Sequence, residues 1–301
     1  MKKLFLFLFV AVFSVISAIG QTQQDNFSPL NTQRLYINGS EAMFPVLAEM
    51  VTKFNYQYQF GGHKNVNLEV KNQLQGSTMG LESLLEGHSN LATSTRPMTQ
   101  QEKDEFKRSN LAVKEFVVAR EALTVVVNSR ASVYALTAEQ ISGIFSGKIT
   151  NWLEVGGEDL KIKVFIRSNT SGCYQGFKDM FFKNGEDYSP TALQLSSNAQ
   201  IKQNLEKFDG AISFLGYNSA AIKESSVRML KISTDKGLTF IEPNQMSIDN
   251  GTYSLVRKCY VYCLETDYQN RVQIKEFIDF LMSSKNGEIW EENGFWQIVK
   301  K

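Results

Sequence analysis

The stretch IKVFIRSNTSG, residues 162–172, decides the fold class of this chain. Its first five residues form a short apolar run in which Lys163 is the only polar side chain, and this run predicts a strand over 162–166. The polar loop 167–172 follows, and residues 173–182 then carry apolar side chains at helical spacing. The sequence therefore predicts a helix that begins where the loop ends, and a strand, a loop and a helix in this order form one unit of an α/β fold.

The same unit recurs three more times along the chain. Strands are predicted over 34–38, 66–70 and 122–127 from their short apolar runs. The first two strands lead through Gly- and Ser-containing loops into helices, one over 43–54 and one that ends at Gly87. The third helix opens on a capping box formed by Thr137 and Gln140. Four units of this kind predict an α/β protein.

Length and charge limit the function classes. The chain has 301 residues, of which 43% are hydrophobic, so it is long enough for two domains with cores of their own. It carries 32 basic and 31 acidic side chains. A nucleic-acid binder needs a basic surface, because its affinity depends on neutralising phosphates. We therefore expect no nucleic-acid partner, and any anion site must be local.

The first twenty residues have the pattern of a secretory signal peptide. Lys2 and Lys3 precede an apolar run over 4–13, and small residues precede a cleavage site near Gly20-Gln21. A transmembrane anchor is the alternative, but serines interrupt a run that is already shorter than about 20 residues. Cleavage would leave 30 basic and 31 acidic residues, a net charge of −1. We expect an exported, periplasmic protein without a lipid anchor, since no cysteine lies near the cleavage site.

The few cysteines and histidines indicate neither a disulfide nor a metal site. Cys259 and Cys263 fall on one predicted strand, where they would lie about 13 Å apart at roughly 3.3 Å per residue. This distance is too long for a disulfide. Cys173 is isolated, and the only histidines are His63 and His88. Because zinc-ligand spacing is missing, we expect no metal and no other cofactor.

Three of the loops place Gly and Ser immediately before a helix. The first backbone N–H groups of a helix have no internal partner, and together with the helix dipole they form an anion site. Helix capping alone is the alternative, because Ser and Thr are preferred caps without any ligand. Two of the loops lie beside an arginine, Arg96 and Arg167. The planar guanidinium suits a tetrahedral oxyanion, which favours an anion site over capping.

Several stretches resemble the periplasmic phosphate-binding proteins of ABC transporters. They are GSEAMFP at 39–45, GSTMG at 76–80, STRP at 94–97, the block 136–152, the loop 167–172 and GAI at 210–212. The resemblance implies a two-lobed periplasmic binding protein fold of type II with the ligand in the cleft between the lobes. Lobe 1 would comprise residues 33–121 plus 253–301, and lobe 2 residues 122–252. Trp152 would be buried in lobe 2 or stack on a ligand, and we expect residues 294–296 to pack against lobe 1.

The resemblance also implies ligand contacts. It assigns to the anion the backbone N–H groups of Phe44 and Gly172, the side chains of Ser77, Arg167 and Ser171, and position 173. With their neighbours, the candidate ligand-binding residues are Ser40, Met43, Phe44, Ser77, Thr95, Arg96, Arg167, Ser171, Gly172 and Cys173.

This chain departs from its relatives at a few of these positions. Met43 and Cys173 stand where many relatives have a hydroxyl, so two hydroxyl donors are lost. Thr95 stands where some relatives have an aspartate that accepts the proton of phosphate. Glu41 is either a substitute for this acceptor or a solvated acid in a first helical turn.

The function expected from the resemblance is capture of inorganic phosphate and its delivery to an ABC transporter permease, by a monomer. A protein of the same fold could instead bind another oxyanion, such as sulfate, without a transporter. A cysteine-dependent hydrolase built on Cys173 is a more remote alternative. It needs a base within hydrogen-bond reach of the thiol, but both histidines are distant in sequence and no nucleophile-elbow motif occurs. We therefore expect no enzyme.

Overall fold

The computed structural model describes residues 34–60, 67–70, 76–221 and 227–298. The predicted signal peptide and its cleavage site lie outside these residues, as does His63. In the described part of the chain, no helix is both long and apolar enough to cross a lipid bilayer. Those residues also contain no group of His, Cys, Asp and Glu side chains that could hold a metal ion.

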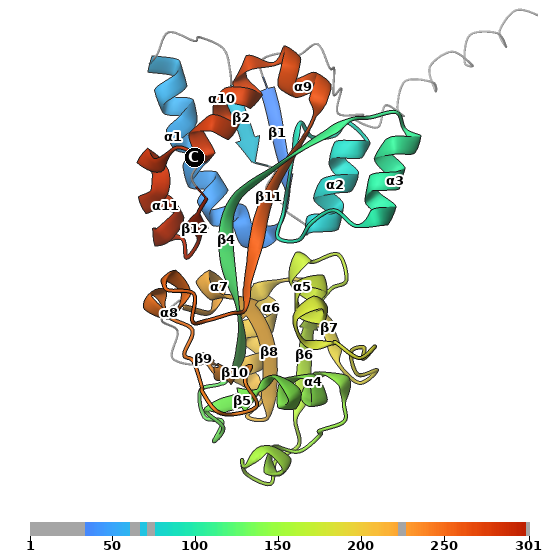
Figure 1. Cartoon of the computed structure of the whole chain (residues 1–301), viewed down its shortest axis with the longest axis vertical. Coiled ribbons are helices and arrows are strands. Elements are labelled where there is room, and N and C mark those ends of the chain that lie inside the picture. Colours follow the sequence, from blue (N-terminus) through green and yellow to red (C-terminus); the bar gives the residue numbers. More distant parts are fainter. Residues whose placement is uncertain (1–33, 61–66, 71–75, 222–226, 299–301) are drawn as a thin grey trace, which may run out of the picture. The chain divides into compact units, whose positions relative to one another are not determined.

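One twisted sheet runs through the described chain. Its ten described strands follow the order β2-β1-β3-β11-β4-β8-β6-β7, with β9 and β12 both paired to β4. The long strand β4 (Val113–Asn128) pairs antiparallel with β11 through its first part and with β8 through its last part. It is therefore shared by both halves of the sheet (Figure 1).

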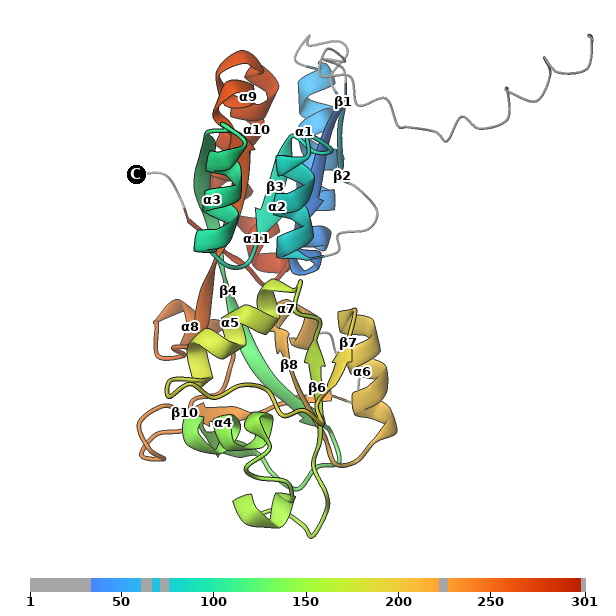
Figure 2. The same cartoon turned by 90° about the vertical axis from the view of Figure 1, so that its right-hand side faces the viewer.

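The first half is built on the strands that precede β4 and on β11. Helices cover both faces of its sheet (Figure 2). Its elements are β1 (Arg34–Gly39), a 3-10 turn (Glu41–Met43), α1 (Phe44–Phe60), β2 (Asn67–Val70), α2 (Ser77–Leu85), β3 (Leu91–Ser94), α3 (Gln100–Arg108), β11 (Val256–Leu264), α9 (Glu265–Asn270), α10 (Val272–Leu281), a 3-10 turn (Ser284–Asn286), α11 (Gly287–Glu292) and β12 (Trp296–Gln297).

The second half contains the elements between β4 and β11. They are β5 (Ala135–Thr137), α4 (Ala138–Ser146), a 3-10 turn (Trp152–Val155), β6 (Lys163–Arg167), α5 (Gly172–Phe181), β7 (Leu193–Leu195), α6 (Asn198–Lys207), β8 (Ala211–Gly216), α7 (Tyr217–Ala221), β9 (Val227–Met229), β10 (Lys231–Ser233) and α8 (Gln245–Asp249).

Each half packs apolar side chains on both faces of its sheet. On β11, the side chains alternate between the two faces, as a strand requires. Cys259 and Val261 enter the cluster formed with α1 and α10, while Tyr260 and Tyr262 pack with α2 and α3. In the second half, α4 and α5 cover one face and α6 the other. Helices on both faces of a sheet define an α/β fold, which confirms the predicted class.

Most predicted units are confirmed, with different bounds. The strand and helix of the opening stretch are β6 and α5, and the capping box of Thr137 and Gln140 opens α4. The third predicted strand, 122–127, is only the last part of β4, because β4 begins at Val113. All three cysteines are free and buried in the structure.

Of the predictions for three aromatic residues, those for Trp152 and Phe295 are confirmed and the one for Trp296 is wrong. Trp152 is buried in the cluster of the second half and its indole N–H donates to the Gly210 carbonyl at 3.2 Å, which confirms a packing role. Phe295 packs in the first half as predicted. Trp296 does not, since it belongs to the cluster of the second half, where its ring lies against Tyr217. Pairing of β12 with β4 carries its side chain there.

Candidate anion-binding site

The candidate site begins at the carboxyl ends of parallel strands. β1 lies between β2 and β3, and β6 lies between β7 and β8, with parallel pairing in each case. The chain therefore leaves the central strand once to each side, which opens a crevice at the strand's carboxyl end. Ser40 follows β1, Thr95 follows β3, and Arg167 ends β6.

Capping explains only one of the three Gly-Ser loops. Ser171 caps α5, because its hydroxyl accepts a hydrogen bond from the Cys173 N–H at 3.2 Å. Ser40 makes no side-chain cap although it is 3% exposed, and α2 begins after Gly76, which has no side chain to offer. The side chain of Ser40 thus caps no helix, and no side chain caps the first N–H groups of α2.

The hydroxyl groups of Ser77 and Thr95 converge on Gly172. A Cβ atom placed on Gly172 would lie 2.3 Å from Thr95 Oγ1 and 2.5 Å from Ser77 Oγ. Ser77 Oγ accepts a hydrogen bond from the Thr95 N–H at 3.2 Å, so its own proton is available to a ligand. Thr95 Oγ1 is buried and has no partner among the described residues. A buried hydroxyl without a partner is costly, so Thr95 Oγ1 has hydrogen-bonding capacity left for a ligand.

Arg167 brings the positive charge of this site. Its side chain is 3% exposed, and its Nη2 donates to Glu41 Oε2 at 2.6 Å and to the Ser196 carbonyl at 2.8 Å. Nη1 donates to Asn198 Oδ1. The Nε–H is buried and, within the described chain, unpartnered. One edge of the guanidinium is therefore fixed by the protein and another is left for an anion.

Residues of the two halves are in contact at this site. The Thr78 N–H donates to the Thr170 carbonyl at 3.3 Å, which joins the start of α2 to the loop before α5. Gly76 has a φ of 120° and would bring a Cβ within 2.5 Å of the same carbonyl, so only glycine fits there. The donors of α2 and of α5 therefore share one small volume.

Met43, Phe44, Arg96 and Cys173 are also held by protein groups, as Ser77, Arg167 and Ser171 are. The side chain of Met43 is fully buried in the core of the first half, and the Phe44 N–H donates to the Glu41 carbonyl. Both guanidinium Nη atoms of Arg96 donate to Glu102, at 2.7 and 2.5 Å. Cys173 Sγ lies 3.0 Å from Arg257 Nη2. Their contact with an anion stays a prediction.

Arg96 supports the site through α2 and α3. Its Nη2 donates to Thr78 Oγ1 at 2.8 Å, in the first turn of α2. Glu102 in turn belongs to the capping box of α3 with Thr99. Burial alone would raise the pKa of Glu102, but the hydrogen bonds from Arg96 and Thr99 hold this pKa below its ordinary value. The Glu102 carboxylate thus stays ionised at neutral pH, and its hydrogen bonds with Arg96 fix the loop between β3 and α3.

Glu121, Arg257 and Asn198 were not predicted from the sequence. Arg257 donates from Nε to Glu121 Oε2 at 3.0 Å while it contacts Cys173. Burial alone would lower the pKa of Arg257, but Cys173 and Glu121 hold it above its ordinary value. Glu121 and Arg257 could have been recognised from the sequence as candidates for a buried pair, because each is a charged residue among apolar neighbours in a strand. Charged residues are rarely buried without a partner.

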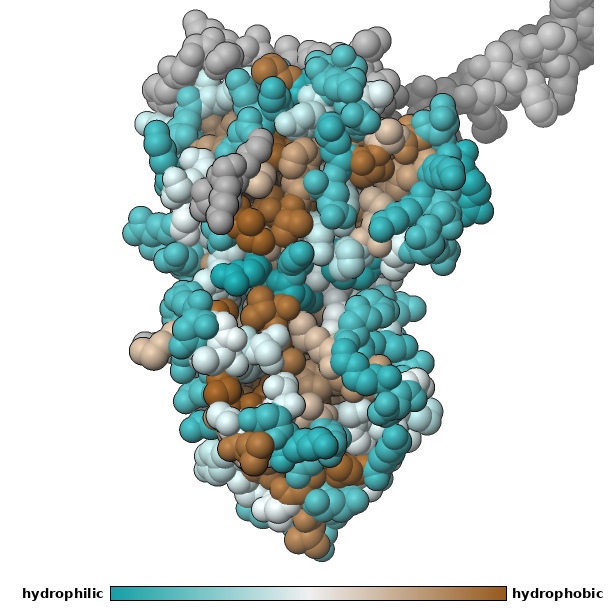
Figure 3. Space-filling model, in the orientation of Figure 1, coloured by the Kyte–Doolittle hydropathy of each residue, from teal (hydrophilic) through white to brown (hydrophobic). Residues whose placement is uncertain are grey.

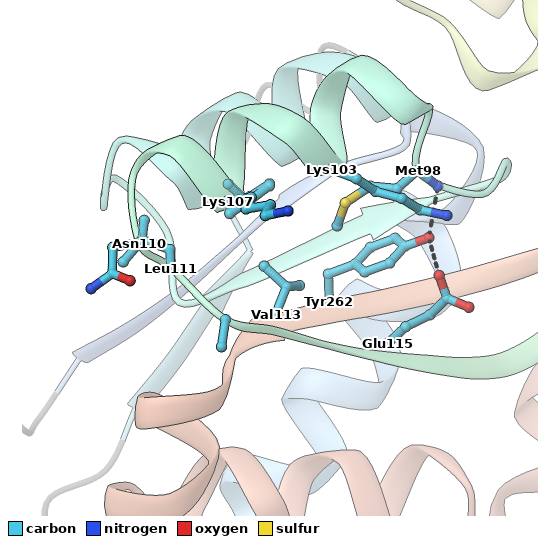
Figure 4. A pocket seen from close by; sticks show the side chains of 10 residues that line it. Met98, Lys103, Lys107, Asn110, Leu111, Val113, Glu115 and Tyr262 are labelled. Carbon is cyan, nitrogen blue, oxygen red and sulfur yellow. Dashed lines mark hydrogen bonds between the residues drawn. The ribbon is translucent and has the colours of Figure 1, made fainter.

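A groove outside this site lies between α3 and strands β4 and β11 (Figure 4). It has a volume of about 480 Å³. Tyr262 lies in it, where its hydroxyl donates to Glu115 Oε2 at 3.0 Å and accepts from the Met98 N–H at 3.1 Å. The outward face of α3 above it is hydrophilic (Figure 3). None of the candidate anion ligands lines this groove.

Comparison with known proteins identifies the class. Residues 19–285 match the model of a family described as PBP superfamily domain. The chain belongs to this family, and its fold is the two-lobed fold of periplasmic phosphate-binding proteins.

Three similar proteins are described as phosphate-binding or phosphate-transport proteins. The chain is 27% identical to the phosphate-binding protein PstS of Borreliella burgdorferi, over 98% of each chain. It is 28% identical to an ABC-type phosphate transport receptor of Vibrio cholerae, with a TM-score of 0.67 over 89% of this chain and all of that one. A structure from Clostridium perfringens that contains bound phosphate has the same fold, with a TM-score of 0.75 and 24% identity over 88% of this chain and 99% of that one.

Proposed function

We propose that this protein captures inorganic phosphate between its two lobes and delivers it to the permease of an ABC transporter. The convergence of Ser77, Thr95 and Gly172 carries the proposal, because it unites hydroxyl donors and a helix start from both halves. The buried Nε–H of Arg167 adds a charged donor. These groups match the oxygens of a small tetrahedral anion. Binding of phosphate by the relatives supports this ligand over other oxyanions.

The ligand contacts that we propose are narrower than the set expected from sequence. We assign direct contact to Ser40, Ser77, Thr95, Arg167, Ser171 and Gly172. Met43, Phe44, Arg96 and Cys173 would instead support these residues. Met43 is buried in the core of the first half, and the Phe44 N–H donates to the Glu41 carbonyl. Both Nη atoms of Arg96 donate to Glu102, and the Cys173 thiol lies against Arg257. Their role is then to hold the donors in place rather than to touch the anion.

The proposal includes the organisation of the mature protein. Lobe 1 would comprise residues 33–121 plus 253–301, and lobe 2 residues 122–252. Separate apolar clusters in the two halves support a division into two lobes, while Tyr253, Leu255 and Trp296 pack in the cluster of the second half. The protein would be exported to the periplasm as a monomer after cleavage near Gly20-Gln21. Closure of the lobes on phosphate would give the permease a shape to recognise.

A binding role is also favoured over catalysis. The thiol of Cys173 is buried at 2% exposure and lies against Arg257, and the described histidine, His88, is exposed and lies at the end of α2. A nucleophile without a base in reach is poorly suited to hydrolysis.

Calorimetric titration of the chain from Gln21 with phosphate and with sulfate tests the function. We expect phosphate binding at one site, and Arg167→Ala should weaken it by about 3 kcal/mol, roughly a hundredfold, because the buried anion loses a charged partner. The matched control is Arg130→Ala, which removes an exposed arginine. Tighter binding of sulfate than of phosphate, or unchanged phosphate affinity in Arg167→Ala, would contradict the proposal.

A further inference from the structure

Glu41 connects the two halves at the candidate site. It begins the 3-10 turn after β1, one residue beyond Ser40. Its Oε2 accepts from Arg167 Nη2 at 2.6 Å, and its Oε1 accepts from the Asn198 N–H at 3.2 Å. A single carboxylate of the first half thus holds the end of β6 and the start of α6 in the second half. The sequence left open whether Glu41 accepts the proton of phosphate or is a solvated acid, and the structure adds these two protein donors to its carboxylate.

These contacts determine how Arg167 is presented. The Nη2 and Nη1 groups are engaged by Glu41, Ser196 and Asn198, and the Nε–H alone among the guanidinium nitrogens has no partner in the described chain. A guanidinium is planar, so fixing its two Nη groups also fixes the direction of the Nε–H. Asn198 is itself held, because its Nδ2 donates to Ser219 Oγ at 2.9 Å.

The ion pair between Glu41 and Arg167 is largely shielded from water. The Arg167 side chain is 3% exposed and that of Glu41 is 30% exposed, so water screens this pair less than a surface pair. Hydrogen bonds to a charged group are among the stronger ones in proteins. Separation of the halves would have to break both bonds of the Glu41 carboxylate.

We infer that Glu41 is a positioning residue for the bound anion. It orients the Nε–H of Arg167 toward the ligand. It also holds the first half in contact with the second while the ligand is bound. The inference rests on the proposed function, since it concerns the same site. It assigns Glu41 no contact with the anion, so its effect must appear in how long the ligand stays rather than in what ligand is chosen.

Dissociation kinetics test this role. The rate of phosphate release from Glu41→Ala, Glu41→Gln and the wild type is measured by stopped flow, with calorimetry for affinity. Loss of two bonds to charged or helix-start groups should speed release from Glu41→Ala roughly ten- to a hundredfold. Glu41→Gln keeps an acceptor oxygen without the charge, so its release should be faster than that of the wild type and slower than that of Glu41→Ala. The control is Glu49→Ala, an exposed acid of α1 whose release rate should not change.

A double-mutant cycle separates positioning from a general structural effect. Asn198→Ala removes the acceptor on the other side of Arg167, and we expect it to weaken phosphate binding more than additively with Glu41→Ala, because either partner alone still orients the guanidinium. Additive losses would overturn the inference, as would a wild-type release rate in Glu41→Ala. Failure of the wild type to bind phosphate would instead overturn the proposed function, and the inference with it. Should Glu41→Ala fold poorly, Glu41→Gln gives the same decision.

Discussion

At the scale of single residues, the proposed site contains a closely packed glycine. Gly172 begins α5 and packs so closely on two hydroxyl groups that a methyl group has no room. The sequence suggested this residue and its neighbours as candidates, because a strand end, a polar loop and a helix start are local patterns. It could not identify the partner of Arg167, since Glu41 is 126 positions away and meets it only through the tertiary fold.

We predict that Gly172→Ala weakens phosphate binding at least tenfold. Its Cβ would push apart Thr95 Oγ1 and Ser77 Oγ, which lie 2.3 and 2.5 Å from that position. Gly176→Ala is the matched control one turn further along α5, where the nearest atom would be at an ordinary 3.7 Å. Because alanine favours helix, the control should keep its affinity and gain up to about 1 kcal/mol in stability. Calorimetry and urea unfolding measure both; equal phosphate affinity in the two variants would show that the site lies elsewhere.

At the scale of elements, β4 and β11 connect the halves. Arg257 and Glu121 are direct partners in their antiparallel register, and both are buried. The sequence did not reveal the first part of β4, because polar side chains such as the half-buried Lys114 and the exposed Glu115 obscure the alternation of apolar and polar residues there. Gly216 gives space to the carboxylate, since a Cβ on it would be 1.8 Å from Glu121 Oε1.

We predict that Glu121→Gln destabilises the protein by about 3 kcal/mol, because it leaves the Arg257 guanidinium buried without a charge partner. The double variant with Arg257→Met should lose less than Glu121→Gln alone, since no buried charge remains. The exposed pair of Arg130 and Asp209, with side chains 64% and 60% exposed, provides the control, and Arg130→Ala should cost less than about 1 kcal/mol. Urea unfolding gives all three values, and a double variant that is the least stable would refute this view of the pair.

At the scale of the whole molecule, the chain passes from one core to the other within two residues near its end. Phe295 packs in the first half and Trp296 in the second, while β12 pairs with β4 at Arg120 and Ala119. Local patterns predicted that these aromatic residues are buried. They could not predict which core receives Trp296, because this depends on the register of β12 on a strand more than 170 positions earlier.

Trp296 should therefore report movement of the two halves. If phosphate closes the lobes, the surroundings of a side chain at their junction change, whereas Trp152 and Trp290 each lie inside one core. We predict that phosphate changes the tryptophan fluorescence of the wild type and that Trp296→Phe loses most of this change. Trp152→Phe and Trp290→Phe, the matched controls, should keep it. A full signal in Trp296→Phe would mean that binding leaves this junction unmoved, since closure about β4 and β11 must alter the contacts of a ring packed on β4.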